Sequence, residues 1–186
     1  MTEQKIMAPP YESIIVDEHI ELRALHSADA SEFFNLIDNS RKSLGRFLTW
    51  VEATRTIDDS LAFIAKTTEK RAQGEAYSFA IVVDGELAGH INLMHLTSDS
   101  TPEIGYWIAQ RFEGQGITTK ATKALTQYGL ETLRLPKILI RAVPDNGGSN
   151  AIPPKLGYRF VGLRDDKDGS HNHWVIEKRQ SAGGAK

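Results

Sequence analysis

The sequence of 186 residues contains no cysteine. This absence excludes disulfide bonds, thiolate metal sites, iron–sulfur clusters and a cysteine nucleophile, because each of them needs a thiol sulfur. A chain without cysteine also fits a reducing compartment.

Long apolar runs are lacking as well. The longest strongly apolar run is Phe79 to Val83, which is far too short to span a bilayer. The first residues, Met1 to Lys5, lead into no apolar core of the length that a signal peptide needs. We therefore expect a cytoplasmic protein with no membrane partner.

Neither sign of charge is in large excess, because the chain has 22 Lys and Arg residues and 24 Asp and Glu residues. A protein that wraps nucleic acid needs a broad basic surface, so we expect no nucleic-acid partner. The six histidines also give no metal pattern. His90 and His95 lack the spacing of ligands, and no carboxylate cluster completes a site beside His171 and His173. We therefore predict no metal.

The composition is that of an ordinary folded domain, with 40% hydrophobic and 25% charged residues. The length suits one domain, which we place at 14–179, with flexible termini at 1–13 and 180–186. Period-two or continuous apolar patterns predict strands at 20–25, 77–83, 87–94, 103–108, 137–143, 158–163 and 173–178.

Helical patterns alternate with these strands. Ser27 caps a first predicted helix, whose apolar face includes Phe33 and Ile37. A second runs from Thr56 or Asp58 to Gly74, with Ile57, Leu61, Ile64 and Ala65 on one face. A third covers 118–133, and the stretch from Pro144 to Pro154 is irregular or a short helix. This order predicts one mixed α/β domain.

The most informative segment is the turn between the strand at 103–108 and the helix at 118–133. It reads Arg111-Phe-Glu-Gly114-Gln115-Gly116. A helix start offers unpaired N–H groups and the positive end of its dipole, and glycines let the backbone approach an anion. The turn is therefore a candidate diphosphate site, although glycines also occur there in plain turns. It is not a P-loop, because no Gly-Lys-Ser/Thr follows, and it lacks the third glycine of the dinucleotide fingerprint.

Two separated motifs extend this pattern. The first is Glu103-Ile-Gly-Tyr-Trp-Ile108 followed by Arg-x-x-Gly-x-Gly; the second is Asn146-Gly-Gly-Ser149-Asn150 followed by Lys155-Leu-Gly-Tyr158. Together, in this order, they resemble the GNAT superfamily of acyl-CoA-dependent N-acetyltransferases. The combination is similar to the branch that includes the ribosomal-protein serine and alanine N-acetyltransferases, and the likeness covers most of residues 14–179.

The resemblance implies the GNAT fold, a mixed α/β domain with a central twisted, mostly antiparallel sheet, two splayed strands and flanking helices. The splayed strands would be 103–108 and 137–143, and the pantetheine of acetyl-CoA would lie between them, paired with the backbone near Ile108. Backbone N–H groups from Arg111 through Thr118 would hold the diphosphate. The cofactor-binding residues implied by the resemblance are Ile108, Arg111, Gly114, Gln115, Gly116, Ile117, Thr118 and Asn146.

The resemblance also implies a direct attack of an amine on the thioester, which suits a chain without a cysteine nucleophile. Glu103 would be the general base, through a water, and Ser149 would protonate or hydrogen-bond the departing sulfur. The structural alternatives are a solvated strand-end carboxylate for Glu103, a helix cap for Ser149 and a turn residue for Asn146.

The acceptor implied by this branch is a protein N-terminal α-amine, such as that of a ribosomal protein. The alternatives are a small amine (polyamine, amino acid or antibiotic) and a sensor that binds acyl-CoA without turnover. The polar stretch 165–173 lacks the aromatic hairpin tip common in the ribosomal-protein enzymes, and Pro153-Pro154 departs from the usual helix there. Trp50 would line an acceptor pocket or pack in the core. The sequence is silent on oligomeric state, and a homodimer stays open.

Overall fold

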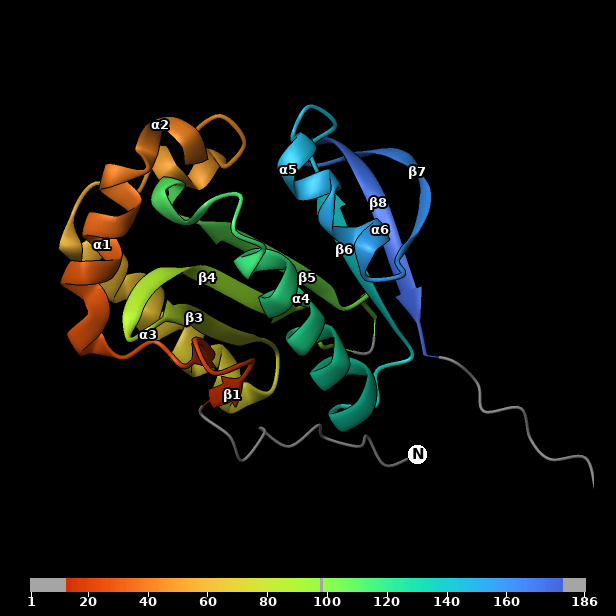
Figure 1. Ribbon diagram of the computed structural model, residues 1–186, viewed down its shortest axis with the longest axis horizontal. Coiled ribbons are helices and arrows are strands. Elements are labelled where there is room, and N and C mark those ends of the chain that lie inside the picture. The colour runs from red at the N-terminus through yellow and green to blue at the C-terminus, as the bar shows by residue number, and fades with distance from the viewer. Residues whose placement is uncertain (1–12, 98, 179–186) are drawn as a thin grey trace, which may run out of the picture.

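The computed structural model describes residues 13–97 and 99–178. In these residues eight strands form one sheet in the order β1-β2-β3-β4-β5-β6-β8-β7 (Figure 1). The strands are β1 (Ser13–Ile15), β2 (Ile20–Arg23), β3 (Tyr77–Val83), β4 (Glu86–Met94), β5 (Glu103–Ile108), β6 (Lys137–Ala142), β7 (Arg159–Asp166) and β8 (Gly169–Glu177). Neighbouring strands are antiparallel except β5 and β6, which are parallel.

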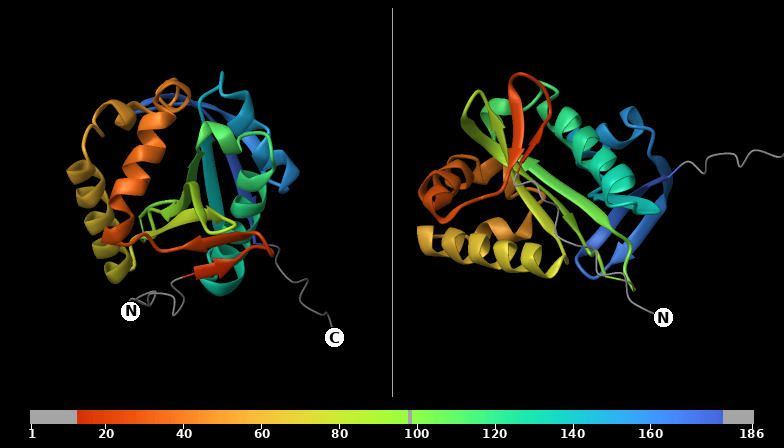
Figure 2. Two further views of the ribbon diagram at one scale, coloured as in Figure 1. Left: turned by 60° about the vertical axis from the view of Figure 1, so that its left-hand side comes forward. Right: turned by 90° about the horizontal axis from the view of Figure 1, so that it is seen from below.

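Helices cover both faces of this sheet. The longer ones are α1 (Ala30–Asn39), α3 (Ile57–Gln73) and α4 (Ile117–Gln127), and the one-turn helices are α2 (Arg41–Leu44), α5 (Gly147–Asn150) and α6 (Ile152–Lys155). Short 3₁₀ turns lie at Ser27–Asp29, Thr49–Glu52 and Gln110–Phe112, and a π-helical turn at Tyr128–Thr132 follows α4. Figure 2 shows α4 on one face of the sheet and α1 with α3 on the other.

Each face has its own hydrophobic core. On the α4 face, Ile117, Ala121 and Leu125 pack against strand residues that include Ile104. On the α1 face, Phe33 and other helix residues pack against strand residues that include Trp107. Because successive strand residues point to opposite faces, Glu103, Gly105 and Trp107 face α1, whereas Ile104 and Tyr106 face α4.

The parallel strands β5 and β6 pair at only one position, Glu103 with Leu139. The Leu139 N–H also donates to the Pro102 carbonyl at 2.8 Å. β6 is paired with β8 along its whole length, from Lys137 to Ala142. After Leu139 it has no further pairing with β5, so β5 and β6 separate toward their carboxyl ends. This geometry confirms the predicted splayed strands in a mostly antiparallel sheet.

Local signals for the second helix are confirmed. Thr56 and Asp59 form a capping box, in which the Asp59 N–H donates to the Thr56 hydroxyl oxygen and the Thr56 N–H donates to the Asp59 carboxylate. Gly74 ends α3 with a φ of 72°, in the left-handed region. The predicted turn at Asp84-Gly85 is also present, with φ of 50° and 85°.

Other local predictions are wrong. Ser27 does not cap the first helix, because the first turn begins after His26, whose N–H donates to Asp29. The predicted core face of α3 is incomplete, since Ile57 and Leu61 are exposed and Ile64 is buried. Ala65 is exposed too, and Ser60 is buried together with Ile64. The buried face of α3 is therefore rotated from the predicted one and includes a polar residue, which an apolar pattern does not show.

The ends of several elements also differ from the predictions. The helix predicted at 118–133 leaves α-helical geometry at Tyr128, where the π-helical turn begins. The closing hairpin is longer than predicted, because the polar residues 164–173 pair as strand and tight turn. Polar residues can form strands at a sheet edge, where one face meets water. The strand β1 was not predicted.

The predicted domain bounds stay a prediction, because residues 1–12 and 179–186 lie outside the described residues. The first strand starts at Ser13, one residue before the predicted boundary. No helix within the described ranges combines the length and the apolar character needed to cross a membrane.

His90 lies inside the α1-side core with no hydrogen-bond partner for Nε2 among the described residues. Its ring packs against Trp107 at 6.4 Å and edge-on against Phe33 at 6.0 Å and Phe63 at 5.3 Å between centroids. Burial lowers the pKa of His90 to about 4, because a charged imidazole would lose its hydration there.

His90 should therefore make the fold sensitive to acid. The unfolded chain binds this proton at a higher pH than the folded chain, so stability is complete above pH ~6.5 and falls as the pH drops toward 4. The loss attributable to His90 should reach about 3 kcal/mol. Urea midpoints measured between pH 7.5 and pH 4.5 should fall less steeply for His90→Leu than for the wild type, with the exposed His19→Leu as control. Parallel profiles for all three proteins would contradict this assignment.

Candidate active site

The turn between β5 and α4 leaves a row of backbone N–H groups free. The N–H groups of Phe112 and Glu113 bond back to Ala109 and Gln110 within the 3₁₀ turn. The N–H groups of residues 114–119 have no acceptor among the described residues, and Lys120 is the first to bond back, to Gly116. We call residues 114–119 the phosphate cradle. The predicted span of N–H groups began at Arg111, so the phosphate cradle begins three residues later than predicted.

The cradle is open because of its glycines. Gly114 and Gly116 have φ of 75° and 76°, and no atom lies within 4 Å of where a side-chain carbon would stand. Gly116 is the residue before α4, and no side chain caps that helix start. The free N–H groups and the positive end of the helix dipole therefore favour an anion here. The residues fit the expected diphosphate.

The side chains around the cradle point elsewhere. Arg111 pairs with Glu86 and stacks on Phe112, so its guanidinium is engaged on the β3–β4 hairpin. The Gln115 amide donates to the Arg111 carbonyl at 3.0 Å. The Ile117 side chain is buried in the α4-side core and anchors the helix start, and Thr118 is half-buried. At Arg111, Gln115 and Ile117, only the backbone is available to an anion in this geometry.

Ile108 lies at the carboxyl end of β5, where the gap between β5 and β6 is open. Its pairing partner is Gly89 on β4, and its other edge faces the gap without a partner strand. Unpaired strand edges can bond to an amide-rich ligand. The structure thus brings Ile108 and the cradle to one end of the gap, as predicted.

Ser149 and Asn146 lie across the gap, on α5 beyond the end of β6. Asn146 caps α5 by accepting the Ser149 N–H at 3.1 Å, so Ser149 lies inside the helix and does not cap it. The Tyr106 hydroxyl donates to the Ser149 carbonyl at 3.1 Å, and burial raises the pKa of Tyr106 well above its ordinary value. This bond fixes α5 against β5 and leaves the Ser149 hydroxyl without a bond among the described residues.

Glu103 lies at the closed end of the gap, where β5 and β6 meet. Its side chain is only 9% exposed. The Nε–H of Arg141 on β6 donates to both carboxylate oxygens at 3.0 Å. Glu103 is therefore a buried, ion-paired carboxylate, and the alternative of a solvated strand-end residue is wrong.

Arg141 is held in turn by the β7–β8 hairpin. Its Nη1 lies 3.2 Å from Asp166 and 3.0 Å from Asp168. Although burial alone lowers the pKa of Arg141, the charge of Glu103 and these hydrogen bonds raise it on balance, so Arg141 stays charged. Sequence analysis missed this role, because the partners of Arg141 lie on strands that only the sheet brings together.

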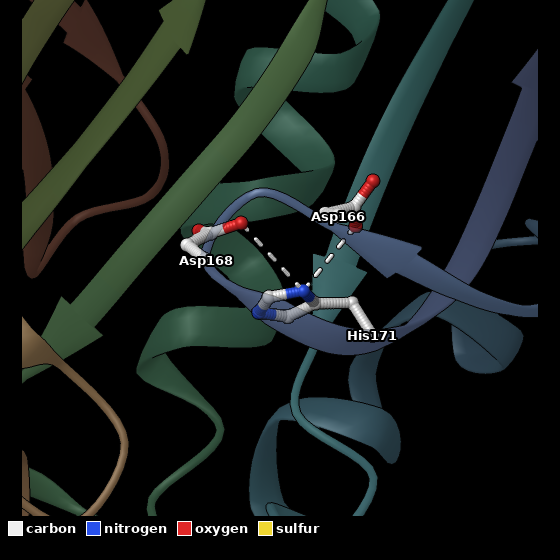
Figure 3. A group of neighbouring side chains, drawn as sticks. All are labelled: Asp166, Asp168 and His171. Atoms are coloured by element: carbon white, nitrogen blue, oxygen red, sulfur yellow. Dashed lines mark ion pairs between the residues drawn. The ribbon is translucent and has the colours of Figure 1, made fainter.

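Histidines complete this cluster. His173 Nε2 lies 2.9 Å from Asp166, and His171 Nδ1 lies 3.3 Å from the same carboxylate. The bond from His173 lowers the pKa of Asp166, with a further contribution from Arg141 and an opposing effect of burial. Figure 3 shows the His171 ring between Asp166 and Asp168. The expectation that no carboxylates gather beside these histidines is thus wrong, and the guanidinium of Arg141 supplies the positive charge between them.

Trp50 packs on Trp107, with ring centroids 6.0 Å apart, and is 38% exposed. Trp50 therefore lies outside the buried core, against a buried residue on the face of β5 that also carries Glu103, and its role in an acceptor pocket stays a prediction.

The contact between Glu103 and Arg141 should support the fold. Replacing Arg141 by Met leaves a buried carboxylate without its counter-charge, so the free energy of unfolding should fall by about 3 kcal/mol. The double variant Arg141→Met with Glu103→Met should recover more than half of that loss, because both charges are removed together. Urea unfolding at pH 7 measures this effect. A single Arg141→Met variant as stable as the wild type would contradict it.

Comparison with known proteins identifies the fold and the class. Residues 19–159 match the family described as acetyltransferase (GNAT) domain. YdaF of Bacillus subtilis, named provisionally as a ribosomal N-acetyltransferase, is 34% identical over 153 residues, which cover 81% of this chain and 84% of YdaF. The ribosomal-protein-serine acetyltransferase of Escherichia coli is 28% identical over 152 residues, covering 81% of this chain and 85% of that protein.

Solved structures agree on the fold. The crystal structure of the microcin C7 self-immunity acetyltransferase MccE in complex with acetyl-CoA and AMP covers 92% of this chain, and this chain covers 99% of it, with a TM-score of 0.85 at 23% identity. The predicted mixed α/β fold and the acyltransferase class are confirmed, as is the likeness to the ribosomal-protein branch. The chain belongs to the GNAT acetyltransferase family.

Proposed function

We propose that this protein transfers the acetyl group of acetyl-CoA to the α-amine of a protein N-terminus, of the ribosomal-protein type, in the cytoplasm. The observation that supports it most is the gap between β5 and β6, which has an anion cradle at its open end and a carboxylate at its closed end. The two relatives named as ribosomal acetyltransferases support the acceptor class.

The cradle and the strand edge orient the donor. N–H groups of Gly114, Gln115, Gly116, Ile117 and Thr118 would hold the diphosphate, and the free edge near Ile108 would pair with the pantetheine arm. From Ile108 to Glu103 the strand spans about 17 Å, so an extended arm would bring the thioester toward the closed end of the gap. Asn146 contributes by capping α5 and so placing Ser149.

Glu103 and Ser149 flank the gap from opposite sides. Glu103 points to the α1 face of β5, whereas Ser149 is tied to Tyr106, which points to the α4 face. The Ser149 hydroxyl would donate to the departing thiolate. Glu103 places negative charge where an ammonium must lose a proton, directly or through a water, before the nitrogen can attack.

The acceptor side carries excess negative charge. Three carboxylates, on Glu103, Asp166 and Asp168, surround the single guanidinium of Arg141. This arrangement favours a cationic acceptor. An α-amine, with an ordinary pKa of ~7.7–8.0, gives up its proton more readily than a lysine amine at ~10.4.

A small amine is the second candidate, because Trp50 presents an exposed aromatic surface stacked on Trp107. Aromatic faces attract organic cations and planar groups. In this case, Trp50→Ala should raise the KM for small amines and leave the KM for peptides unchanged.

Thiol release from acetyl-CoA tests the function cleanly, since the chain has no thiol of its own. Peptides with free N-terminal Ser or Ala should show a kcat/KM at least ~10-fold above that of polyamines, amino acids or lysine peptides with a blocked N-terminus. Mass spectrometry should place the acetyl group on the α-nitrogen. A preference for a small amine would overturn the acceptor, and the absence of thiol release with every amine would indicate a sensor.

The glycines of the cradle should be required for donor binding. In Gly114→Val or Gly116→Val, a branched side chain in the left-handed region distorts the turn and blocks the approach of the diphosphate. Calorimetry should show acetyl-CoA affinity at least ~10-fold weaker than in the wild type. The matched control is Gly157→Val, since Gly157 has a φ of 84° and equally open surroundings away from the cradle. Equal affinity in all variants would refute the cradle.

The carboxylate of Glu103 should be required for turnover and dispensable for donor binding. Glu103→Gln should lower kcat by about 10²-fold or more, because the charge next to the reacting amine is lost. Acetyl-CoA affinity should stay within about twofold by calorimetry. Glu69→Gln, on the exposed side of α3, is the control for a generic loss of charge. Turnover in Glu103→Gln equal to that of the wild type would disprove a role for Glu103.

A further inference from the structure

His95 lies directly after β4 in an unusual backbone conformation. Its φ is 59°, in the left-handed region, which residues other than glycine rarely adopt. Met94, the residue before it, pairs with Glu103 across the sheet. If β4 continued as a regular strand, His95 would point to the face opposite Glu103, because strand residues alternate.

The backbone turn instead brings the His95 ring to Glu103. The distance between His95 Nε2 and Glu103 Oε2 is 4.0 Å, and the His95 side chain is 53% exposed. Backbone in this sparsely populated region is found most often at functional sites. The conformation thus places a titratable, solvent-accessible side chain beside the carboxylate at the closed end of the gap.

Glu103 is already engaged as the acceptor of an ion pair. Both of its oxygens accept from Arg141, and its side chain is 9% exposed. Protonation of Glu103 would give up this buried ion pair and leave Arg141 with a neutral partner. Its negative charge can instead stabilise a positive charge on a neighbouring ring.

We propose that His95 is a catalytic residue that accepts the proton of the acceptor ammonium, with Glu103 as the counter-ion of the resulting imidazolium. This inference rests on the proposed acetyl transfer and refines its proton path. The neutral imidazole takes one proton from the ammonium, and the freed nitrogen forms a bond to the thioester carbon. The carbon–sulfur bond then breaks, and the thiolate takes the second proton that the nitrogen loses. His95 afterwards releases its proton to solvent.

The surroundings favour a positive charge on this ring. Glu103 is the charged group that faces His95 among the described residues. Behind it lie Arg141 on β6, then Asp166 and Asp168 on the hairpin. His171 and His173 contact Asp166 and are the other titratable groups of the cluster. This cluster holds three carboxylates and one guanidinium, so its net charge is negative beside the proposed route of the proton.

Glycine is the best replacement for His95, because it adopts a φ of 59° without strain and removes the imidazole. His95→Gly should therefore fold, with an unfolding midpoint at or above that of the wild type. Its kcat with the N-terminal peptide should fall by about 10²-fold. The pH–kcat profile should change shape, because the variant lacks the ring that accepts the proton. Acetyl-CoA affinity should not change.

Added imidazole is the decisive probe. It should restore turnover of His95→Gly in proportion to its concentration, and it should leave Glu103→Gln unchanged, since that variant retains its own ring. His95→Asn, which also tolerates left-handed backbone, should behave like His95→Gly. His19→Asn removes another exposed histidine that contacts a carboxylate, Asp84 at 2.8 Å, and should retain wild-type turnover. His171 and His173 are present in every variant, so they cannot account for a difference.

Wild-type turnover in His95→Gly, or a loss that imidazole does not restore, would overturn the assignment of His95. Failure of the proposed function is distinct, because the wild-type protein itself would then release no thiol with N-terminal peptides. A wild-type enzyme that is active on peptides, with an unchanged pH profile in His95→Gly, would refute this inference alone.

Discussion

The parallel strands β5 and β6 share one backbone pairing, between Glu103 and Leu139, and then separate. Each strand is satisfied on its outer side, β5 by β4 and β6 by β8. The inner edges are left without partners, which is costly in a buried sheet unless a ligand or water bonds to them. Because β5 and β6 stop pairing here, a gap opens between them, with Glu103 at its closed end. The proposed donor binding and acceptor access both depend on this gap.

Two kinds of polar group border this gap. At its open end these are backbone N–H groups, arranged by Gly114, Gly116 and the start of α4. At its closed end they are side chains, arranged by the sheet itself. The side chains of Arg111 and Gln115 bond to other groups and leave the N–H groups of the cradle uncovered. The closed end depends on particular side chains from β5, β6 and the β7–β8 hairpin.

The ion pair between Glu103 and Arg141 links the two halves of the sheet. Arg141 reaches one carboxylate across the junction of β5 and β6 and two more on the hairpin turn. Because the junction has a single backbone pairing, this side-chain network helps to hold β5 and β6 together. In the proposed reaction the same network also sets the charge that an incoming amine would meet.

Short stretches of the sequence were enough to predict the order of the elements after β1, the glycine turn before α4, the end of α3 at Gly74 and the family motifs, because these signals are local. The diphosphate span that it predicts, from Arg111 to Thr118, begins three residues before the row of free N–H groups at 114–119. The sequence did not determine the role of Arg141 or the position of His95, and it placed the charged hairpin residues among plain polar ones. Those assignments depend on contacts such as Arg141 with Glu103, 38 positions apart in the chain. These contacts depend on the register of the strands and on the left-handed backbone of His95. Only the tertiary structure determines either of them.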